Sequence, residues 1–147
     1  MKAFILALGF SLALAFASAG LSQDSGDSAS SSVSSLDGVF NQEQLDRAQA
    51  IYDQQCAACH GADLSGSASA PQLAGVGFAF YWNGRSVHEL FDYTKATMPL
   101  TRPGGLSDQE YVDLVALILH ANGARMGENE LPTDEEVLKE ITFATEE

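Results

Sequence analysis

Two cysteines and a histidine in one short stretch constrain this chain more than any other feature. Cys56 and Cys59 are the only cysteines among its 147 residues; two alanines separate them, and His60 follows directly. The length suits one domain with some additional segments and argues against a multidomain enzyme. What the sequence predicts therefore depends mainly on what this cluster binds.

The spacing Cys-x-x-Cys-His favours covalent attachment of one haem c. Cys56 and Cys59 can add to the two vinyl groups of one haem, and His60 then presents its imidazole to the iron from the same side. A zinc site needs a second ligand pair, which His88 and His120 do not supply with another cysteine. A thioredoxin-like pair would begin a helix in a βαβ unit, whereas this pair ends a predicted helix and no strand is visible. A disulfide between the two cysteines would leave the long loops unexplained.

The composition is that of a globular protein with a strongly acidic surface. Apolar residues make up 46% and charged residues 18% of the chain, and 20 acidic side chains against 7 basic ones give a net charge of −13. A surface of this sign repels phosphate backbones, so no nucleic-acid partner is expected. The acidity predicts salt-sensitive docking to basic patches on partner proteins; a saline habitat is the alternative explanation.

The two ends of the chain differ from its middle. Residues 1–19 carry one lysine, an apolar run and a small-x-small pattern, which predicts a signal peptide cleaved after about Ala19 and a periplasmic protein. Contact with a membrane is expected only if this segment is not cleaved. Residues 20–38 are rich in serine and predict a flexible linker. Residues 39–147 then form the domain, which ends in an acidic helix and a solvated tail, or else in an acidic surface for a basic partner.

Four helix starts are recognisable, each a capping residue followed three positions later by Glu or Gln. The pairs are Asn41/Gln44, Ser86/Glu89, Ser107/Glu110 and Thr133/Glu136. The expected helices span about 42–55, 87–95, 108–121 and 134–141. The stretch 61–84 has no sustained period and is expected to be a loop, and no segment predicts a sheet. An all-α domain of about four helices with long loops would wrap a large apolar cofactor.

Apolar periodicity predicts which helix faces are buried. On the first helix the apolar stripe is Leu45, Ala48, Tyr52 and Cys56, with Asp46, Arg47, Asp53 and Gln54 away from it; on the third it is Tyr111, Leu114, Val115, Ile118 and Leu119. The small Ala48 would let these two helices approach closely. His120 is expected to face water on the side of Asp113, and His88 to be a solvated surface histidine. The last helix is expected to bury Val137, Leu138 and Ile141.

These residues together resemble those of a class I monohaem c-type cytochrome over about 43–123. The matching motifs are Tyr52-x-x-x-Cys56-x-x-Cys59-His60-Gly61, Pro71-x-Leu73-x-Gly75 and Met98-Pro99. The resemblance implies the cytochrome c fold, in which the first and last main helices cross near one haem edge. The family commonly has Gly at the position of Ala48, which implies a slightly wider crossing here. The resemblance also implies that the Pro71 carbonyl accepts a hydrogen bond from His60.

Met98 is the expected sixth iron ligand. It lies in a predicted extended loop held by Pro99 and Pro103, and it matches the Met-Pro position of the family. Met126 lies beyond the body expected to surround the haem. An axial Met gives a high-potential electron carrier, whereas an open position allows ligand binding.

Three residues near the turn Asn83-Gly84 are expected to serve the haem propionates. Trp82 offers an indole N–H, Arg85 offers a guanidinium suited to carboxylates, and Tyr81 lies next to them.

The expected function is single-electron transfer and not catalysis. The stretch 97–123 is similar to cytochromes that accept electrons from periplasmic quinoprotein dehydrogenases, which implies a donor such as a PQQ-dependent alcohol dehydrogenase and an acceptor such as a terminal oxidase. A role as the cytochrome subunit of a dehydrogenase complex, including a sulfur-compound dehydrogenase, is related. The alternatives are a peroxidase or gas sensor with an open or labile sixth position, and an exported protein with a reactive dithiol and no haem.

Overall fold

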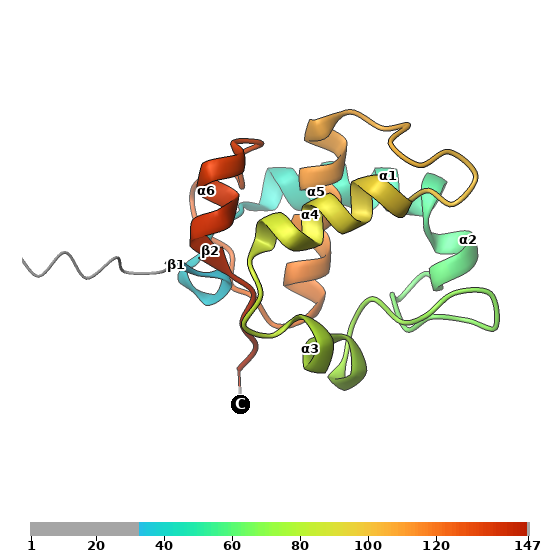
Figure 1. Ribbon diagram of the computed structural model, residues 1–147, viewed down its shortest axis with the longest axis horizontal. Helices are drawn as coiled ribbons and strands as arrows, with labels where there is room; N and C mark the ends of the chain where they lie inside the picture. The colour runs from blue at the N-terminus through green and yellow to red at the C-terminus, as the bar shows by residue number, and fades with distance from the viewer. Residues whose placement is uncertain (1–32, 147) are drawn as a thin grey trace, which may run out of the picture. The chain divides into compact units, whose positions relative to one another are not determined.

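The computed structural model describes residues 33–146, which form mostly helices (Figure 1). In chain order the elements are β1 (Val33–Ser34), the 3-10 helix η1 (Ser35–Asp37), α1 (Gln42–Gln55), α2 (Ala57–His60), α3 (Val76–Trp82), α4 (Val87–Thr97), α5 (Asp108–Ala121), α6 (Glu135–Glu140) and β2 (Ile141–Thr142). The predicted all-α class is confirmed. The predicted signal segment at 1–19 and the linker up to residue 32 lie outside the described residues.

The capping residues start the main helices where the sequence predicts. The side chain of Asn41 accepts a hydrogen bond from the Gln44 amide at the start of α1, and Ser86 and Ser107 form complete capping boxes at α4 and α5. The fourth start was wrong by one residue. Asp134, not Thr133, caps α6 by accepting from the amides of Glu136 and Val137. A carboxylate satisfies these free amides and also favours the positive end of the helix.

The expected loop at 61–84 contains a helix, α3, which corrects that prediction. Phe78 and Trp82 are four residues apart and bury one face of α3, but Val76 and Phe80 are 87% and 90% exposed on the other. Because apolar residues occupy both faces, the sequence shows no helical period here. With α2, this helix raises the number of α-helices in 33–146 to six, where about four were expected.

The first and last elements of the described region, β1 and β2, pair in a small parallel sheet that the sequence did not predict. Val33 of β1 pairs with Ile141 of β2. The Ser35 side chain is fully buried, donating to the carbonyl of Ala144 and accepting from its amide, both at 3.0 Å. Residues 33–38 were predicted to belong to the flexible linker, but they are folded against the rest of the domain. The predicted solvated tail is also wrong at Phe143, which is fully buried.

Helix α5 forms the centre of the core and packs against both α1 and α4 (Figure 1). Ala48 of α1 is fully buried, as are Tyr111 and Val115 of α5, as the apolar stripes predict. The predicted crossing of these two helices is thus present. At its far end α5 stops at Asn122, and Gly123 follows with a φ of 94°, a conformation that glycine adopts without strain.

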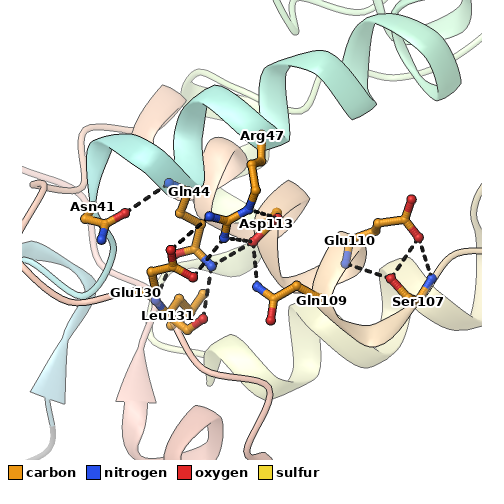
Figure 2. A network of polar contacts seen from close by, with 9 residues as sticks. All are labelled: Asn41, Gln44, Arg47, Ser107, Gln109, Glu110, Asp113, Glu130 and Leu131. Atoms are coloured by element: carbon orange, nitrogen blue, oxygen red, sulfur yellow. Dashed lines mark hydrogen bonds and ion pairs between the residues drawn. The ribbon is translucent and has the colours of Figure 1, made fainter.

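A polar network also joins α1 to α5 (Figure 2). Asp113 is buried, with 2% of its surface exposed, and Arg47 reaches it with Nε 3.0 Å from Oδ2. Gln44 and Gln109 each donate a side-chain N–H to Oδ1 of Asp113. The prediction that Asp113 marks the water-facing side of its helix is therefore wrong, whereas Arg47 lies away from the apolar stripe, as expected. The amide and guanidinium donors compensate the buried charge.

The acidic C-terminal helix packs its apolar residues unevenly. Leu138 and Ile141 are buried as predicted, whereas Val137 is 42% exposed and does not join the core. Among residues 33–146, no helix is both long and apolar enough to cross a bilayer.

Candidate functional site

A cavity of about 570 Å³ lies among α1, α2, α3, α4 and α5. Its wall combines the cysteine and histidine cluster with mainly apolar side chains. The lining residues are Tyr52, Gln55, Cys56, Cys59, His60, Ser69, Ala70, Pro71, Gln72, Leu73, Gly77, Phe78, Tyr81, Trp82, Leu90, Tyr93, Thr94, Met98, Pro99, Leu100, Leu106, Tyr111, Leu114 and Ile118. Its volume is within the range of pockets that bind cofactors.

One turn of helix brings the cysteine and histidine cluster to this cavity. The backbone amides of Cys59 and His60 both donate to the carbonyl of Cys56, at 3.0 and 2.9 Å. Cys56 is half-buried, Cys59 is exposed and His60 is 6% exposed. Burial, followed by the nearby Cys59, raises the pKa of the Cys56 thiol to about 11. All three side chains line the same wall.

The loop after α2 orients the His60 ring. Nδ1 of His60 lies 2.8 Å from the carbonyl oxygen of Pro71, which leaves Nε2 as the nitrogen able to bind a metal. Gly66 allows the loop to turn back so closely: its φ is 83°, and a Cβ there would lie 2.6 Å from the Gln72 amide nitrogen. A side chain at position 66 would thus displace the segment that carries Pro71.

Tyr52 of α1 stabilises the same turn through a hydrogen bond. Its hydroxyl donates to the carbonyl of Gly61 at 2.7 Å, and only 1% of its surface is exposed. Burial is the main cause that raises the pKa of Tyr52 to about 12. The hydroxyl therefore remains a hydrogen-bond donor at neutral pH.

Met98 reaches the cavity from the end of α4. It is the capping residue of that helix, with extended backbone angles, and its amide still donates to the Thr94 carbonyl at 2.8 Å. The hydroxyl of Tyr111 in α5 donates to the Met98 carbonyl at 2.7 Å. Two elements thus fix the backbone at Met98. The sequence did not single out Tyr111 for this role, because only the fold brings residues 98 and 111 into contact.

The methionine and the two histidines that the sequence places away from the haem, Met126, His120 and His88, lie outside the cavity lining. Met126 is 47% exposed, and His120 is exposed on α5, as expected. His88 was expected to be solvated, but its side chain is only 14% exposed because it packs between Asp92 of α4 and Glu135 of α6, at 3.6 and 3.4 Å. Its environment is an acidic contact between two helices, not the cavity.

The three expected propionate donors separate into two groups. Trp82 is 4% exposed and lines the cavity, and Tyr81 lines it while remaining 60% exposed. Arg85 lies outside the lining: its guanidinium stacks 4.6 Å from the Trp82 ring centroid and pairs with Glu89 at 2.9 Å. Arg85 therefore contacts two residues of the cavity wall, Tyr81 and Trp82, without lining the cavity itself.

The sequence missed the aromatic packing that builds this wall. The ring centroids of Phe78 and Trp82 are 6.0 Å apart, and those of Trp82 and Tyr93 are 5.7 Å apart. The spacing of four between Phe78 and Trp82 was the one available signal, and the exposed apolar residues around them concealed it.

The donor set and the cavity fit a covalently attached haem c. Two thiols spaced for the vinyl groups, a histidine with one ring nitrogen already engaged, and a methionine sulfur all line one apolar pocket. Within the described residues, no group of three or more His, Cys, Asp or Glu side chains is placed to hold a metal ion by itself. The thiols, the histidine and the methionine in this apolar pocket suit a metal carried by a large cofactor.

Comparison with known families agrees with this geometry. Residues 43–118, more than half of the chain, match the family described as cytochrome c oxidase, cbb3-type, subunit III. No curated protein and no solved structure matches the chain significantly. The matched region contains the Cys56–His60 turn and Met98 and ends within α5. The chain thus belongs to this family of c-type cytochromes, and it is a haem c protein that transfers electrons.

Proposed function

We propose that the chain is a periplasmic single-electron carrier with one haem c, attached to Cys56 and Cys59 and ligated by His60 and Met98. The observation that carries the proposal is that these four side chains, from the junction of α1 and α2, from α2 and from the end of α4, line one cavity. Methionine opposite histidine is the ligand pair of high-potential electron carriers.

The chemistry of the site follows from what its residues do. When bound, haem c supplies an iron that cycles between the ferrous and ferric states. His60, oriented by the Pro71 carbonyl, and Met98, with its backbone held by Tyr111, would hold the iron of that haem and would leave no position for a substrate. The apolar lining excludes water, which favours the less charged ferrous state.

Two side chains are proposed to bind the haem propionates. Trp82 and Tyr81 line the cavity and carry N–H and O–H donors. Arg85 supports them through its stacking on both rings, at 4.6 and 5.0 Å from the centroids, and contributes positive charge close to the wall.

The proposed donor is a periplasmic dehydrogenase, such as a PQQ-dependent alcohol dehydrogenase, and the proposed acceptor is a terminal oxidase. The support is the likeness of residues 97–123 to cytochromes that serve quinoprotein dehydrogenases, together with the export signal expected at 1–19. The net charge of −13 favours basic docking surfaces on both partners. The rate of electron transfer should therefore fall as salt is added.

The test replaces the proposed ligand and a matched methionine. Met98→Ala should keep the haem attached, lower the reduction potential and allow added carbon monoxide or imidazole to bind the iron. Met126→Ala is the control, because Met126 is 47% exposed and lies outside the cavity lining. A Met98→Ala protein that titrates like the parent would show that Met98 is not the ligand.

The partner is tested separately from the ligation. Stopped-flow mixing of the ferric protein with a substrate-reduced quinoprotein alcohol dehydrogenase should give fast reduction that slows with ionic strength. No reduction by this donor, from a protein whose spectrum shows methionine ligation, would reject the partner and retain the carrier. A parent protein that already binds carbon monoxide or peroxide would favour the peroxidase or gas-sensor alternative.

A further inference from the structure

Helix α3 forms part of the cavity wall, but it has few interactions of its own that would stabilise it as a helix. It has seven residues, and Gly75 at its N-terminus provides no side-chain cap. Isolated helices of this length are not stable in water. Its outer residues Val76 and Phe80 are almost fully exposed and pack against little. The position of α3 must therefore depend on contacts with other parts of the chain.

The N-terminal end of α3 is held by Asn122, the residue that ends α5. Its side-chain oxygen accepts from the Gly75 amide at 3.1 Å, and its side-chain nitrogen donates to the carbonyl of Leu73 at 2.9 Å. One amide side chain thus fixes the backbone immediately before α3.

The other end of α3 is held by Phe143, near the C-terminus of the chain. The amide of Gly84 donates to the Phe143 carbonyl at 2.9 Å, and the Phe143 amide donates to the Arg85 carbonyl at 2.8 Å. The Phe143 ring is fully buried and meets Phe78 with centroids 6.0 Å apart, at 62°. Phe78 and Trp82 line the cavity, whereas Phe143 does not. Phe143 therefore supports the wall from outside the cavity.

Phe143 is itself fixed, because the segment that carries it is anchored along its length. We call residues 124–146 the C-terminal strap; it lies wholly beyond the region that matches the family, which ends at residue 118. The Gln44 side chain exchanges two hydrogen bonds with the backbone of Leu131, at 2.8 and 3.0 Å (Figure 2). Further along, β2 pairs with β1 and the Ala144 amide donates to Ser35.

We infer that Phe143 is a positioning residue for the haem cavity. Through Phe143 the C-terminal strap holds α3 in its place in the cavity wall and keeps water away from Phe78 and Trp82. The inference rests on the proposed location of the haem in this cavity. A loosened wall admits water, which favours the more charged ferric state and lowers the reduction potential.

The experiment compares two substitutions at Phe143 with a control in the same strap, all in the haem-loaded full chain. Phe143→Ala removes the ring, and Phe143→Leu retains part of the apolar contact and serves if the alanine variant fails to fold. Leu131→Ala is the control, because Leu131 is equally buried in the strap and the substitution removes only its side chain, while the backbone hydrogen bonds to Gln44 that anchor the strap at α1 are kept. The readouts are amide hydrogen exchange over residues 76–84 and the reduction potential.

Phe143→Ala is expected to speed amide exchange over residues 76–84 by roughly tenfold or more. The amides of α1 should stay protected, because only α3 opens locally. The reduction potential of Phe143→Ala should fall below that of the parent, with Phe143→Leu in between. Leu131→Ala should leave both readouts at parental values, even where its unfolding midpoint falls. Unchanged exchange and potential in both Phe143 variants would overturn the inference, as would an equal fall of potential in Leu131→Ala.

Failure of the proposed function would look different from failure of this inference. A parent protein without the spectrum of methionine ligation would contradict the role of Met98, and the exchange over 76–84 would still report whether Phe143 holds α3. A parent with that spectrum and insensitive Phe143 variants would contradict only the role of the strap.

Discussion

The Nε atom of Arg47 lies 3.0 Å from Oδ2 of Asp113, so an ion pair joins α1 to α5 on the polar side of their crossing (Figure 2). Asp113 is 2% exposed, whereas the Arg47 side chain is 37% exposed. Hydrogen bonds to Glu130 and Asp113 raise the pKa of Arg47 above its ordinary value. The pair therefore consists of a buried anion held by a partly solvated cation.

Asp113→Ala is expected to destabilise the haem-loaded protein by about 3 kcal/mol, because Gln44, Gln109 and Arg47 all lose their buried acceptor. Asp108→Ala on the same helix is the matched control. Asp108 pairs with Lys95 at the surface, with 57% of its side chain exposed. Its loss should cost less than about 1 kcal/mol. Urea unfolding measures both values, and equal costs would contradict a special role for the buried network.

A chain that cannot attach haem should not keep this fold. Without the cofactor, the mainly apolar wall of this cavity of about 570 Å³ would be exposed to water, at a cost of several kcal/mol, which is a large share of the stability of a typical domain. The double variant Cys56→Ala/Cys59→Ala should therefore show little helix by circular dichroism and no cooperative unfolding. A cooperatively folded double variant with parental helix content would contradict the assignment of this cavity to the cofactor.

Acid should weaken the start of α5 through Glu110. Hydrogen bonds from the backbone and side chain of Ser107 hold the pKa of Glu110 below its ordinary value of 4.5. A carboxylate with a lowered pKa in the folded state stabilises the fold above pH 4.5, and this contribution is lost as the pH falls further. In Glu110→Gln, the free energy of unfolding should fall less steeply below pH 4.5 than in the parent. Equal slopes would show that this capping box contributes no pH dependence.

Alkali should act through Tyr52, with the opposite sign. Burial raises the pKa of Tyr52 from 10.0 to about 12, so the folded state keeps the proton that the unfolded chain loses. The stabilisation is complete below pH 10 and is lost as the pH rises towards 12. Tyr52→Phe should lose about 1 kcal/mol at neutral pH, because the Gly61 carbonyl loses its donor, and should show a smaller alkaline fall in unfolding free energy. A parallel alkaline fall in both proteins would contradict this role.

Local patterns predicted the parts of the fold that short stretches of sequence determine. The capping residues Asn41, Ser86 and Ser107 placed three helix starts, and the stripe around Ala48 predicted the crossing with α5. The Cys56–His60 spacing identified the cofactor class, because the chemistry needs both thiols and the imidazole within one turn. These features depend on neighbours in the chain, which a sequence displays directly.

The features that the sequence did not predict depend on residues far apart in the chain. In the sequence, Phe143 lies in an acidic tail, and only its contact with Phe78 shows that it is a core residue. Asp113 likewise resembles a surface acid, and only its contacts with Arg47 and Gln44 show that it is buried. Helix α3 was missed because its outer face is as apolar as its inner one. In each case tertiary contacts override the local composition.

The visible and near-infrared spectrum of the haem-loaded protein tests the proposed ligation by His60 and Met98 most directly. If Met98 is the sixth ligand, the ferric protein will show a weak charge-transfer band from the methionine sulfur to the iron, and the ferrous protein will be low-spin. A high-spin ferric protein without that band would contradict the proposed electron carrier and would point to an open iron site.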